Sequence, residues 1–395
     1  MFKLWVLLVT VYFSTLFHLT SPKDPSDWNN SHTSTHNLND STAYIKILSV
    51  GDLMCHKPQV DGAFVDSAQI YDFNPSFRLV REILSSGDIV IGNLETVTAG
   101  GRFSGYPLFN SPDEFLQAVK KSGFNVIVTS NNHSLDRGEV GLTRTAQLID
   151  SLGLTRVGTY LSEVDRDSIR VIRVGDFRIA ILAYTYGMNG FQLSQDKRYL
   201  VNQIDEEQIR LDLNKSKKAG IDACLVYFHF GNEYERSPNT WQRDIVEKTF
   251  SFGADIILAS HPHVIQPIEY VELNEESELD TGLVAFSLGN FISNQRGRFK
   301  QAGAILEITL EKRISSGECR ISAVAVHPTW VHIQKQKGKN SHTIIPLSNF
   351  NTDLFSKNEI NLMMQANDDT RKQLSGKKIF SMRNKNQREE KSVKQ

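Results

Sequence analysis

Short apolar runs alternate with segments of helical periodicity through the middle of the chain. The apolar runs are rich in β-branched residues, as buried strands are, and lie at 45–50, 88–91, 125–129, 178–184, 224–228, 256–259 and 283–287. Between them, apolar residues spaced for one helix face predict helices at 74–84, 111–123, 139–152, 205–219 and 237–250. Alternating units of this kind predict an α/β domain. Two later strand-like segments, 304–310 and 321–326, have no helix between them and are expected to complete the same domain.

Polar residues mark where several of these helices begin. Asn74 followed by Pro75 predicts a helix cap and first turn, and Asp205 predicts the cap of a later helix. The segment 111–114, Ser-Pro-Asp-Glu, matches a capping box. The helix opened by Pro238 is expected to turn Trp241 toward the core.

The two ends of the chain differ from this pattern. Residues 1–20 form an apolar run without a small-residue cleavage site, which favours an uncleaved signal anchor over a cleaved signal peptide. Residues 21–43 are polar throughout and predict a disordered linker, which leaves 44–350 as the folded domain. We therefore expect a single-pass protein of the cell membrane with its domain outside the cytoplasm. Residues 351–395 predict a basic flexible tail, with binding to an anionic surface as the alternative.

Composition narrows the classes of function. The chain has 395 residues and a net charge of −1, and this overall balance suggests neither nucleic acid nor an acidic polymer as an electrostatic partner. Its three cysteines, Cys55, Cys224 and Cys319, are scattered and odd in number, so they form neither a disulfide framework nor a zinc knuckle. Cys55 is more typical of a small buried residue than of a nucleophile.

Five predicted strands end in groups that can bind metals. These groups are Asp52, then Asn93 and Glu95, then Asn132 and His133, then His229, then His261 and His263. Each has an ordinary alternative, such as a turn residue, a surface charge or a hydrogen-bonded histidine. Because α/β sheets bind ligands at the carboxyl ends of their strands, the five ends together predict one shared site.

The segment from His261 to His263 is the most informative of these ends. Pro262 restricts the residue before it to extended conformations, and in extended chain residues two apart point to the same side. Both imidazoles are therefore expected to face one site. Imidazole, carboxylate and amide oxygen together suit Mn, Fe or Zn. Six or more possible ligands are too many for one zinc, so we predict two divalent ions.

The order of motifs resembles that of the CapA family. The resemblance lies in Gly-Asp-Leu-Met, Gly-Asn-Leu-Glu, Ser-Asn-Asn-His-Ser-Leu-Asp-Arg-Gly, His-Phe-Gly-Asn-Glu-Tyr, Ser-His-Pro-His-Val-Ile-Gln-Pro and Ser-Leu-Gly-Asn-Phe, and covers 45–346. That family is associated with poly-γ-glutamate capsule synthesis and belongs to the calcineurin-like metallophosphoesterase superfamily. The resemblance implies a four-layer α/β/β/α sandwich and a site for two metals.

The resemblance also implies roles for individual residues. The residues that the resemblance implies to be metal ligands are Asp52, Glu95, Asn132, His229, His261 and His263. His133 matches the catalytic histidine and Asp136 the residue that orients it. Asn93, Glu233 and Asn290 are predicted to bind substrate. Met54 stands where many phosphatases of the superfamily have histidine, which predicts a weaker or differently completed metal site.

Two functions follow from this sequence. The first is hydrolysis of a phosphoester-type bond by the two-metal site, with His133 donating a proton to the leaving group. The second is a non-enzymatic role, as an anchored component of a complex that makes or exports an anionic polymer. The expected partners are thus the membrane, a polymer synthesis complex, and an anionic polymer or phosphoester.

Overall fold

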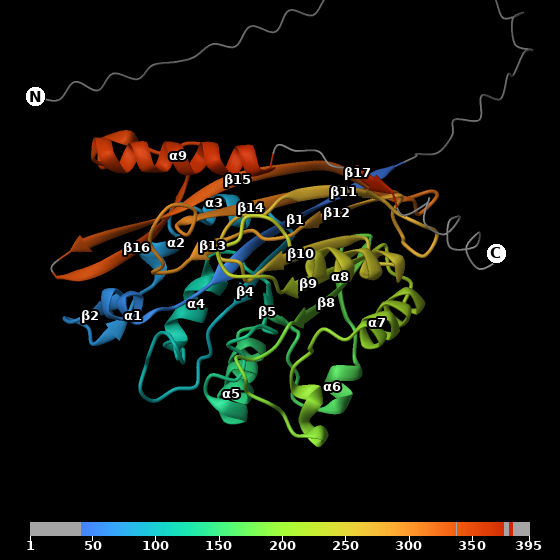
Figure 1. Cartoon of the computed structure of the whole chain (residues 1–395), viewed down its shortest axis with the longest axis horizontal. Helices are drawn as coiled ribbons and strands as arrows, with labels where there is room; N and C mark the ends of the chain where they lie inside the picture. The colour runs from blue at the N-terminus through green and yellow to red at the C-terminus, as the bar shows by residue number, and fades with distance from the viewer. Residues whose placement is uncertain (1–40, 337, 375–378, 382–395) are drawn as a thin grey trace, which may run out of the picture. The chain divides into compact units, whose positions relative to one another are not determined.

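A computed structural model describes residues 41–336, 338–374 and 379–381, shown in colour in Figure 1. The predicted anchor at 1–20 and nearly all of the predicted linker lie outside these residues. Within the described part of the chain, no helix combines the length and apolar character needed to cross a membrane.

Two mixed β-sheets form the centre of the domain. The first has the strand order β16 (Lys339–Pro346), β15 (Cys319–Gln336), β14 (Ala302–Arg313), β1 (Thr42–Leu53), β4 (Ile89–Leu94), β5 (Val126–Val128) and β6 (Thr155–Val157), with β13 (Asn290–Ile292) also paired to β1. The second has the order β17 (Ile379–Ser381), β11 (Ile268–Glu272), β12 (Thr281–Ala285), β10 (Ile256–Ser260), β9 (Ala223–His229), β8 (Phe177–Thr185) and β7 (Arg170–Val174). Strands β1, β4, β5 and β6 run parallel in the first sheet, as do β8, β9, β10 and β12 in the second.

Helices and short turns connect these strands. They are α1 (Lys57–Ala63), α2 (Asn74–Phe77), α3 (Arg81–Ser85), α4 (Asp113–Lys121), α5 (Gly138–Ser151), α6 (Glu163–Asp167), α7 (Glu206–Lys218), α8 (Thr240–Ser251) and α9 (Lys357–Leu374). Two 3₁₀ segments, η1 (Gln195–Leu200) and η2 (Thr352–Leu354), and a hairpin of β2 (Phe64–Val65) and β3 (Ile70–Tyr71) complete the described elements.

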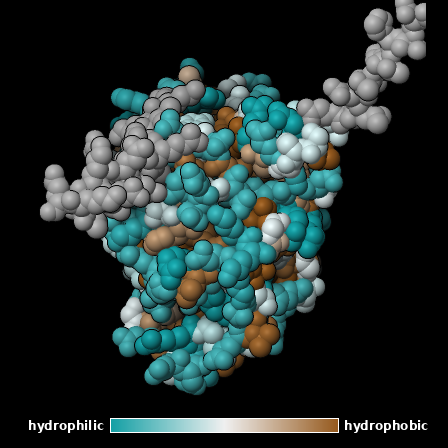
Figure 2. All heavy atoms as spheres, turned by 90° about the vertical axis from the view of Figure 1, so that its right-hand side faces the viewer, coloured by the Kyte–Doolittle hydropathy of each residue, from teal (hydrophilic) through white to brown (hydrophobic). Residues whose placement is uncertain are grey.

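The hydrophobic core has two main parts, because successive side chains of a strand point to opposite faces of its sheet. Ile89 and Ile91 of β4 point into a cluster shared by both sheets, whereas Val90 joins a cluster under α2, α3 and α4. On the other sheet, α7 and α8 bury Leu213 and Phe250. The elements therefore pack in the order helices, sheet, sheet, helices, and the predicted α/β class is confirmed. The face seen in Figure 2 is mostly hydrophilic, with hydrophobic side chains scattered across it.

Several helix boundaries differ from the prediction. The helix expected at 74–84 forms as α2 and α3, because an i→i+3 bond from Val80 N to Phe77 O, of 3.2 Å, tightens the chain between them. Asn74 is not its cap, since the cap is Phe73. The capping box at 111–114 is also absent: Pro112 is the cap of α4 and no side chain bonds there. Asp205 does cap α7, accepting a 2.8 Å bond from the Gln208 backbone N–H.

The prediction that Trp241 faces the core is wrong. The cap of α8 is Asn239, two residues after the predicted start, and Trp241 falls outside the inner stripe. It is 41% exposed, whereas Ile245 and Phe250 are buried.

The prediction of a flexible tail from residue 351 is wrong for 357–374, which form α9. This helix lies across β15 in Figure 1, and its Met363 is fully buried against Trp330 and Ile345. Residues 382–395 lie outside the described residues, so binding of the basic tail to an anionic surface stays a prediction.

The three cysteines are free and buried. Burial raises the pKa of the Cys55 thiol, which opposes formation of the thiolate. Cys55 therefore packs as a small apolar residue, as the sequence predicted.

Candidate metal centre

The carboxyl ends of β1, β4, β5, β9 and β10 meet where the two sheets face each other. Glu95 lies at the centre of this meeting point. Its Oε1 is 3.7 Å from His229 Nε2, 3.8 Å from His263 Nε2 and 4.0 Å from His133 Nε2. These side chains come from strands far apart in the sequence, and parallel pairing brings their ends together.

Asp52, near the end of β1, is buried and well supplied with hydrogen bonds. Its Oδ1 accepts a 2.8 Å bond from Asn93 Nδ2, and its Oδ2 lies 3.1 Å from His263 Nδ1 and 3.4 Å from the His261 backbone N. Burial raises the pKa of Asp52, but the hydrogen bond and charge of His263 outweigh this effect and hold the pKa below its usual range. The group is therefore suited to remain a carboxylate.

Glu95 has the opposite surroundings. It is fully buried, and neither of its carboxylate oxygens has a hydrogen-bond partner among the described residues. Burial, followed by the nearby charge of Asp52, raises the pKa of Glu95 well above its ordinary value. A buried carboxylate without a donor is costly, and a cation between its neighbours would supply the missing interaction.

Two histidines of the cluster, His229 and His261, favour the neutral form that binds metals. Burial and the neighbouring His261 lower the pKa of His229 well below its usual value. Burial and His263 lower the pKa of His261 to about 3. The Nδ1 atom of His261 is buried and has no partner among the described residues, so it is available to a cation.

The backbone around Pro262 differs from the prediction. Strand β10 ends at Ser260, and His261 and His263 have φ angles of +100° and +55°, so the segment is not extended. Such conformations cost about 1–3 kcal/mol each and persist where the surroundings impose them. The Tyr234 backbone N–H donates to Pro262 O at 2.7 Å and helps to hold the turn. The two imidazoles still converge, with ring centroids 5.9 Å apart.

Two groups of side chains can each hold an ion. One comprises Glu95, His261 and His263, and the other comprises Asp52, Glu95 and His229, with ligand atoms in each group within 4.8 Å of one another. Both groups contain Glu95, the carboxylate without a partner. The nitrogen and oxygen donors and this orphaned acid fit a divalent transition metal.

Asn132 lies beside these groups but is engaged within the protein. Its Oδ1 is 2.8 Å from His229 Nε2, and its Nδ2 donates to Asn189 Oδ1 at 3.2 Å. Its role as an amide ligand stays a prediction. Met54 is 2% exposed and belongs to the interior.

His133 and Asp136 form a pair directed at the cluster. His133 Nδ1 is 2.8 Å from Asp136 Oδ2, which also accepts a 2.6 Å bond from the Phe109 backbone N–H. The Phe109 ring packs edge-on against the imidazole, with centroids 4.7 Å apart. These contacts fix the ring so that Nε2 faces Glu95. An imidazole held in this way can exchange a proton at Nε2.

The three residues predicted to bind substrate occupy different positions. Asn93 is buried between Asp52 and His229 and also accepts from Asn131 Nδ2 at 3.1 Å. Asn290 is buried, and its Oδ1 is 3.1 Å from His263 Nδ1. Both therefore support metal-centre side chains, whereas Glu233 is exposed on the loop after β9. Substrate binding by all three stays a prediction.

Sequence reasoning missed several residues of the site. Asn131 donates to Asn93 and to Leu94 O, and Asn189 lies 3.4 Å from His133 Nδ1. The Tyr186 ring, after β8, lies 4.7 Å from that of His261. The available signals were the position of Asn131 beside Asn132 and the position of Tyr186 at the end of another parallel strand.

The chain is similar to a known family of bacterial proteins. Residues 46–295 match the family model described as bacterial capsule synthesis protein PGA_cap. The PGA biosynthesis protein CapA of Bacillus subtilis is 26% identical over 275 residues, which cover 68% of this chain and 70% of that protein. The capsule biosynthesis protein CapA of Bacillus anthracis is 27% identical over 228 residues, and the match spans 55% of this chain and 54% of that relative.

Solved structures with some likeness are more distant. A putative 5′-nucleotidase from Staphylococcus aureus has a TM-score of 0.44 and 15% identity, over 82% of this chain and 58% of that chain. The calcineurin-like phosphoesterase YfkN from Bacillus subtilis has a TM-score of 0.40 and 12% identity, over 84% of this chain and 98% of that chain.

Proposed function

The chain belongs to the bacterial capsule synthesis protein PGA_cap family, and we propose that it is a metal-dependent hydrolase of phosphoester-type bonds that acts in poly-γ-glutamate capsule synthesis or export. In this proposal, the packing of helices, sheet, sheet and helices is the four-layer arrangement of a metallophosphoesterase. The names of the two Bacillus relatives support the role in capsule synthesis.

The observation that carries the proposal is the position of Glu95. It is a fully buried carboxylate without hydrogen-bond donors among the described residues, and it is common to both possible ligand groups. Glu95 would help to hold two divalent ions, Mn, Fe or Zn, and these ions would supply the partners that its carboxylate lacks. The remaining ligands would be Asp52 and His229 on one side and His261 and His263 on the other, with Asn132 as a further donor.

The protein's own residues define the chemistry around these ions. When bound, such ions lower the pKa of a water molecule and polarise a phosphoryl oxygen. Asp136 lies 2.8 Å from Nδ1 of His133 and would hold the ring in place, so that Nε2 can donate a proton to the leaving group. Asn93 and Asn290 keep Asp52 and His263 oriented by hydrogen bonds.

The cellular setting is part of the same proposal. The apolar run at 1–20 would anchor the chain in the cell membrane by a single pass, with 44–350 outside the cytoplasm. There it would meet an anionic polymer or a phosphoester and the other members of a polymer synthesis complex.

A non-enzymatic role in that complex is the second candidate, and Met54 favours it. This buried thioether occupies the place of a histidine ligand in many related phosphatases and is a poor ligand for these ions. The metals would then serve folding or bind polymer carboxylates.

One experiment addresses both candidates. The full-length protein is purified in detergent, its metal content is measured, and it is assayed on phosphomonoesters, phosphodiesters and poly-γ-glutamate with and without EDTA. We expect about two ions per chain and hydrolysis that EDTA abolishes and Mn²⁺ restores. Bound metal without turnover of any substrate supports the structural component, and a protein that binds no metal contradicts both.

A further inference from the structure

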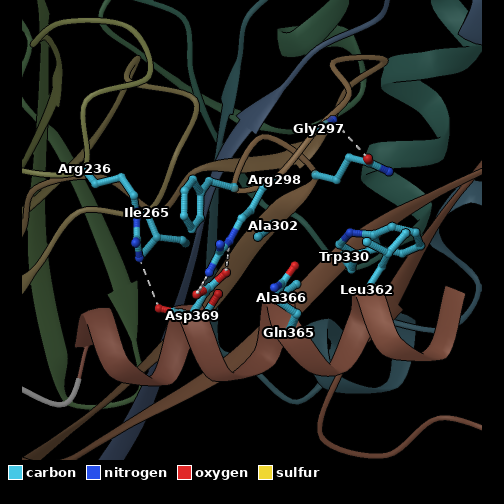
Figure 3. Close-up of a pocket in the computed structure, with 13 residues that line it drawn as sticks. Arg236, Ile265, Gly297, Arg298, Ala302, Trp330, Leu362, Gln365, Ala366 and Asp369 are labelled. Atoms are coloured by element: carbon cyan, nitrogen blue, oxygen red, sulfur yellow. Dashed lines mark hydrogen bonds and ion pairs between the residues drawn. The ribbon is translucent and has the colours of Figure 1, made fainter. Parts of the chain in front are cut away.

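A cavity lies between α9 and the first sheet, and none of the candidate metal ligands lines it (Figure 3). Its volume is about 160 Å³. Apolar side chains form most of its wall, and they include Ile265, Ala302, Trp330, Leu362 and Ala366. An apolar protein cavity of about 150 Å³ is large enough to hold one benzene molecule. The space therefore suits a small ligand of that size.

Charged groups gather at one end of this cavity. Arg298 forms two 2.9 Å bonds with the carboxylate of Asp369, from Nε and Nη2, so its charge is compensated. Arg236 donates from Nη2 only to the Asp369 carbonyl O, at 3.2 Å. Figure 3 shows both arginines reaching toward Asp369 on α9. The Asp369 carboxylate thus pairs with Arg298, whereas Arg236 bonds only to the main chain of Asp369.

Arg236 is left with unused donor capacity. Its Nε is buried and has no acceptor among the described residues. The guanidinium lies over the Phe299 ring, 4.0 Å from the centroid, and this contact fixes its plane. Burial, only partly offset by Asp369, lowers the pKa of Arg236, in keeping with a cation short of negative partners. A planar carboxylate is the group that best matches such a fixed fork.

We propose that this cavity is a binding site for a small monocarboxylate with an apolar body, whose carboxylate pairs with Arg236 and whose hydrocarbon part packs on Trp330 and Ala366. Burial of the hydrocarbon against the apolar wall is favourable, and the buried Nε of the half-buried Arg236 gains the acceptor that it lacks. The site does not depend on the metals, because none of the lining residues belongs to the ligand groups.

The cavity nevertheless shares a loop with the metal centre. Arg236 lies two residues after Tyr234, whose ring centroid is 6.1 Å from that of His263. On its other side, the Arg236 carbonyl O accepts from Gln373 Nε2 of α9 at 2.6 Å. A ligand in the cavity would therefore stabilise the loop that runs past the metal centre.

Isothermal titration calorimetry on the full-length protein in detergent tests the proposal, with benzoate as the probe and benzyl alcohol as its neutral match. We expect benzoate to bind at least tenfold more tightly than benzyl alcohol, since a hydrogen bond to a charged group contributes about that factor or more. Arg236→Gln should reduce benzoate affinity about tenfold or more and leave benzyl alcohol unaffected. Arg320→Gln is the charge control. It removes an exposed arginine that lies at the end of β15 away from the cavity and pairs with Glu311.

A second variant keeps the test decisive if Arg236→Gln does not fold. Ala366→Phe fills the cavity from α9 and should abolish binding of both probes while the Arg236 side chain is kept. EDTA should leave benzoate binding unchanged, because the metals are not involved. Equal affinity for the two probes, absence of benzoate binding, or unchanged binding in Ala366→Phe would each overturn the proposal.

Discussion

Replacing Glu95 by glutamine should change stability in opposite directions with and without metal. Glutamine has nearly the same volume and two polar atoms but cannot ionise, so the substitution mainly removes the titratable group. In the metal-free protein the Glu95 side chain is buried without a hydrogen-bond partner among the described residues, so folding must either keep its proton or bury its charge. The substitution should therefore stabilise the metal-free protein and destabilise the metal-bound one.

The size of the effect follows from the burial of Glu95. A buried polar group without a partner costs about 1–3 kcal/mol, and a charged one more. We therefore expect metal-free Glu95→Gln to exceed the wild type by about 1–3 kcal/mol in free energy of unfolding. Excess metal, at about 1,000 times its dissociation constant, adds about 4.1 kcal/mol to the wild type. The variant should gain much less, because it lacks the carboxylate that is common to both ligand groups.

The pH dependence has a defined sign. Because the folded-state pKa of Glu95 is raised, the metal-free folded protein retains a proton that the unfolded chain loses above about pH 4.3. Wild-type stability should then fall as pH rises from there, by up to about 1.36 kcal/mol per pH unit, until the pH passes the folded-state value. The advantage of the variant should grow over the same range and vanish below it.

Thermal denaturation followed by circular dichroism measures these differences, with about 2 °C expected per kcal/mol for a domain of this size. Wild type and variant are compared in EDTA and in excess Mn²⁺. Glu275→Gln, the same change at an exposed glutamate outside both ligand groups, is the control and should stay within about 0.5 kcal/mol of wild type. The reasoning fails if Glu95→Gln lowers the melting temperature equally in EDTA and in Mn²⁺.

Further predictions concern the catalytic pair, α9 and the anchor. His133→Ala should keep its metal and lose turnover by about 10²–10⁴-fold, and Asp136→Asn should lose less because it acts through His133, as steady-state kinetics and metal analysis would show. Hydrolysis and capsule formation that survive in His133→Ala, while His261→Ala abolishes capsule, would contradict the enzymatic function. Met363→Ala should cost about 2–5 kcal/mol in denaturant unfolding, because this side chain is fully buried under α9; an unchanged midpoint would mean that α9 does not fold with the domain. Alkaline carbonate washing should leave full-length protein in membranes if 1–20 is an anchor, whereas a shortened soluble form would show cleavage.

The sequence alone determined the class of fold and the composition of the candidate site. Alternate side chains of the strand at 88–91 are buried on opposite faces of the sheet. A strand with apolar side chains on both faces is typical of a sheet that is covered on both sides. Parallel strands then bring their carboxyl ends to one edge. For this reason Asp52, Glu95 and His229 could be expected together from the order of strands alone.

Tertiary contacts decided the rest. The positive φ angles of His261 and His263 are imposed by the Tyr234 backbone and by Asp52, which are distant in sequence, so the preference set by Pro262 was overridden. The helical pattern of α9 carries too few apolar residues to predict burial by itself, and it is buried because Trp330 and Ile345 provide a matching surface. Local pattern sets which residues are available at a strand end or on a helix face. The backbone conformation at a site, and the partner that a helix face covers, depend on contacts between residues far apart in the chain, because only those contacts offset the cost of strain and of lost chain entropy.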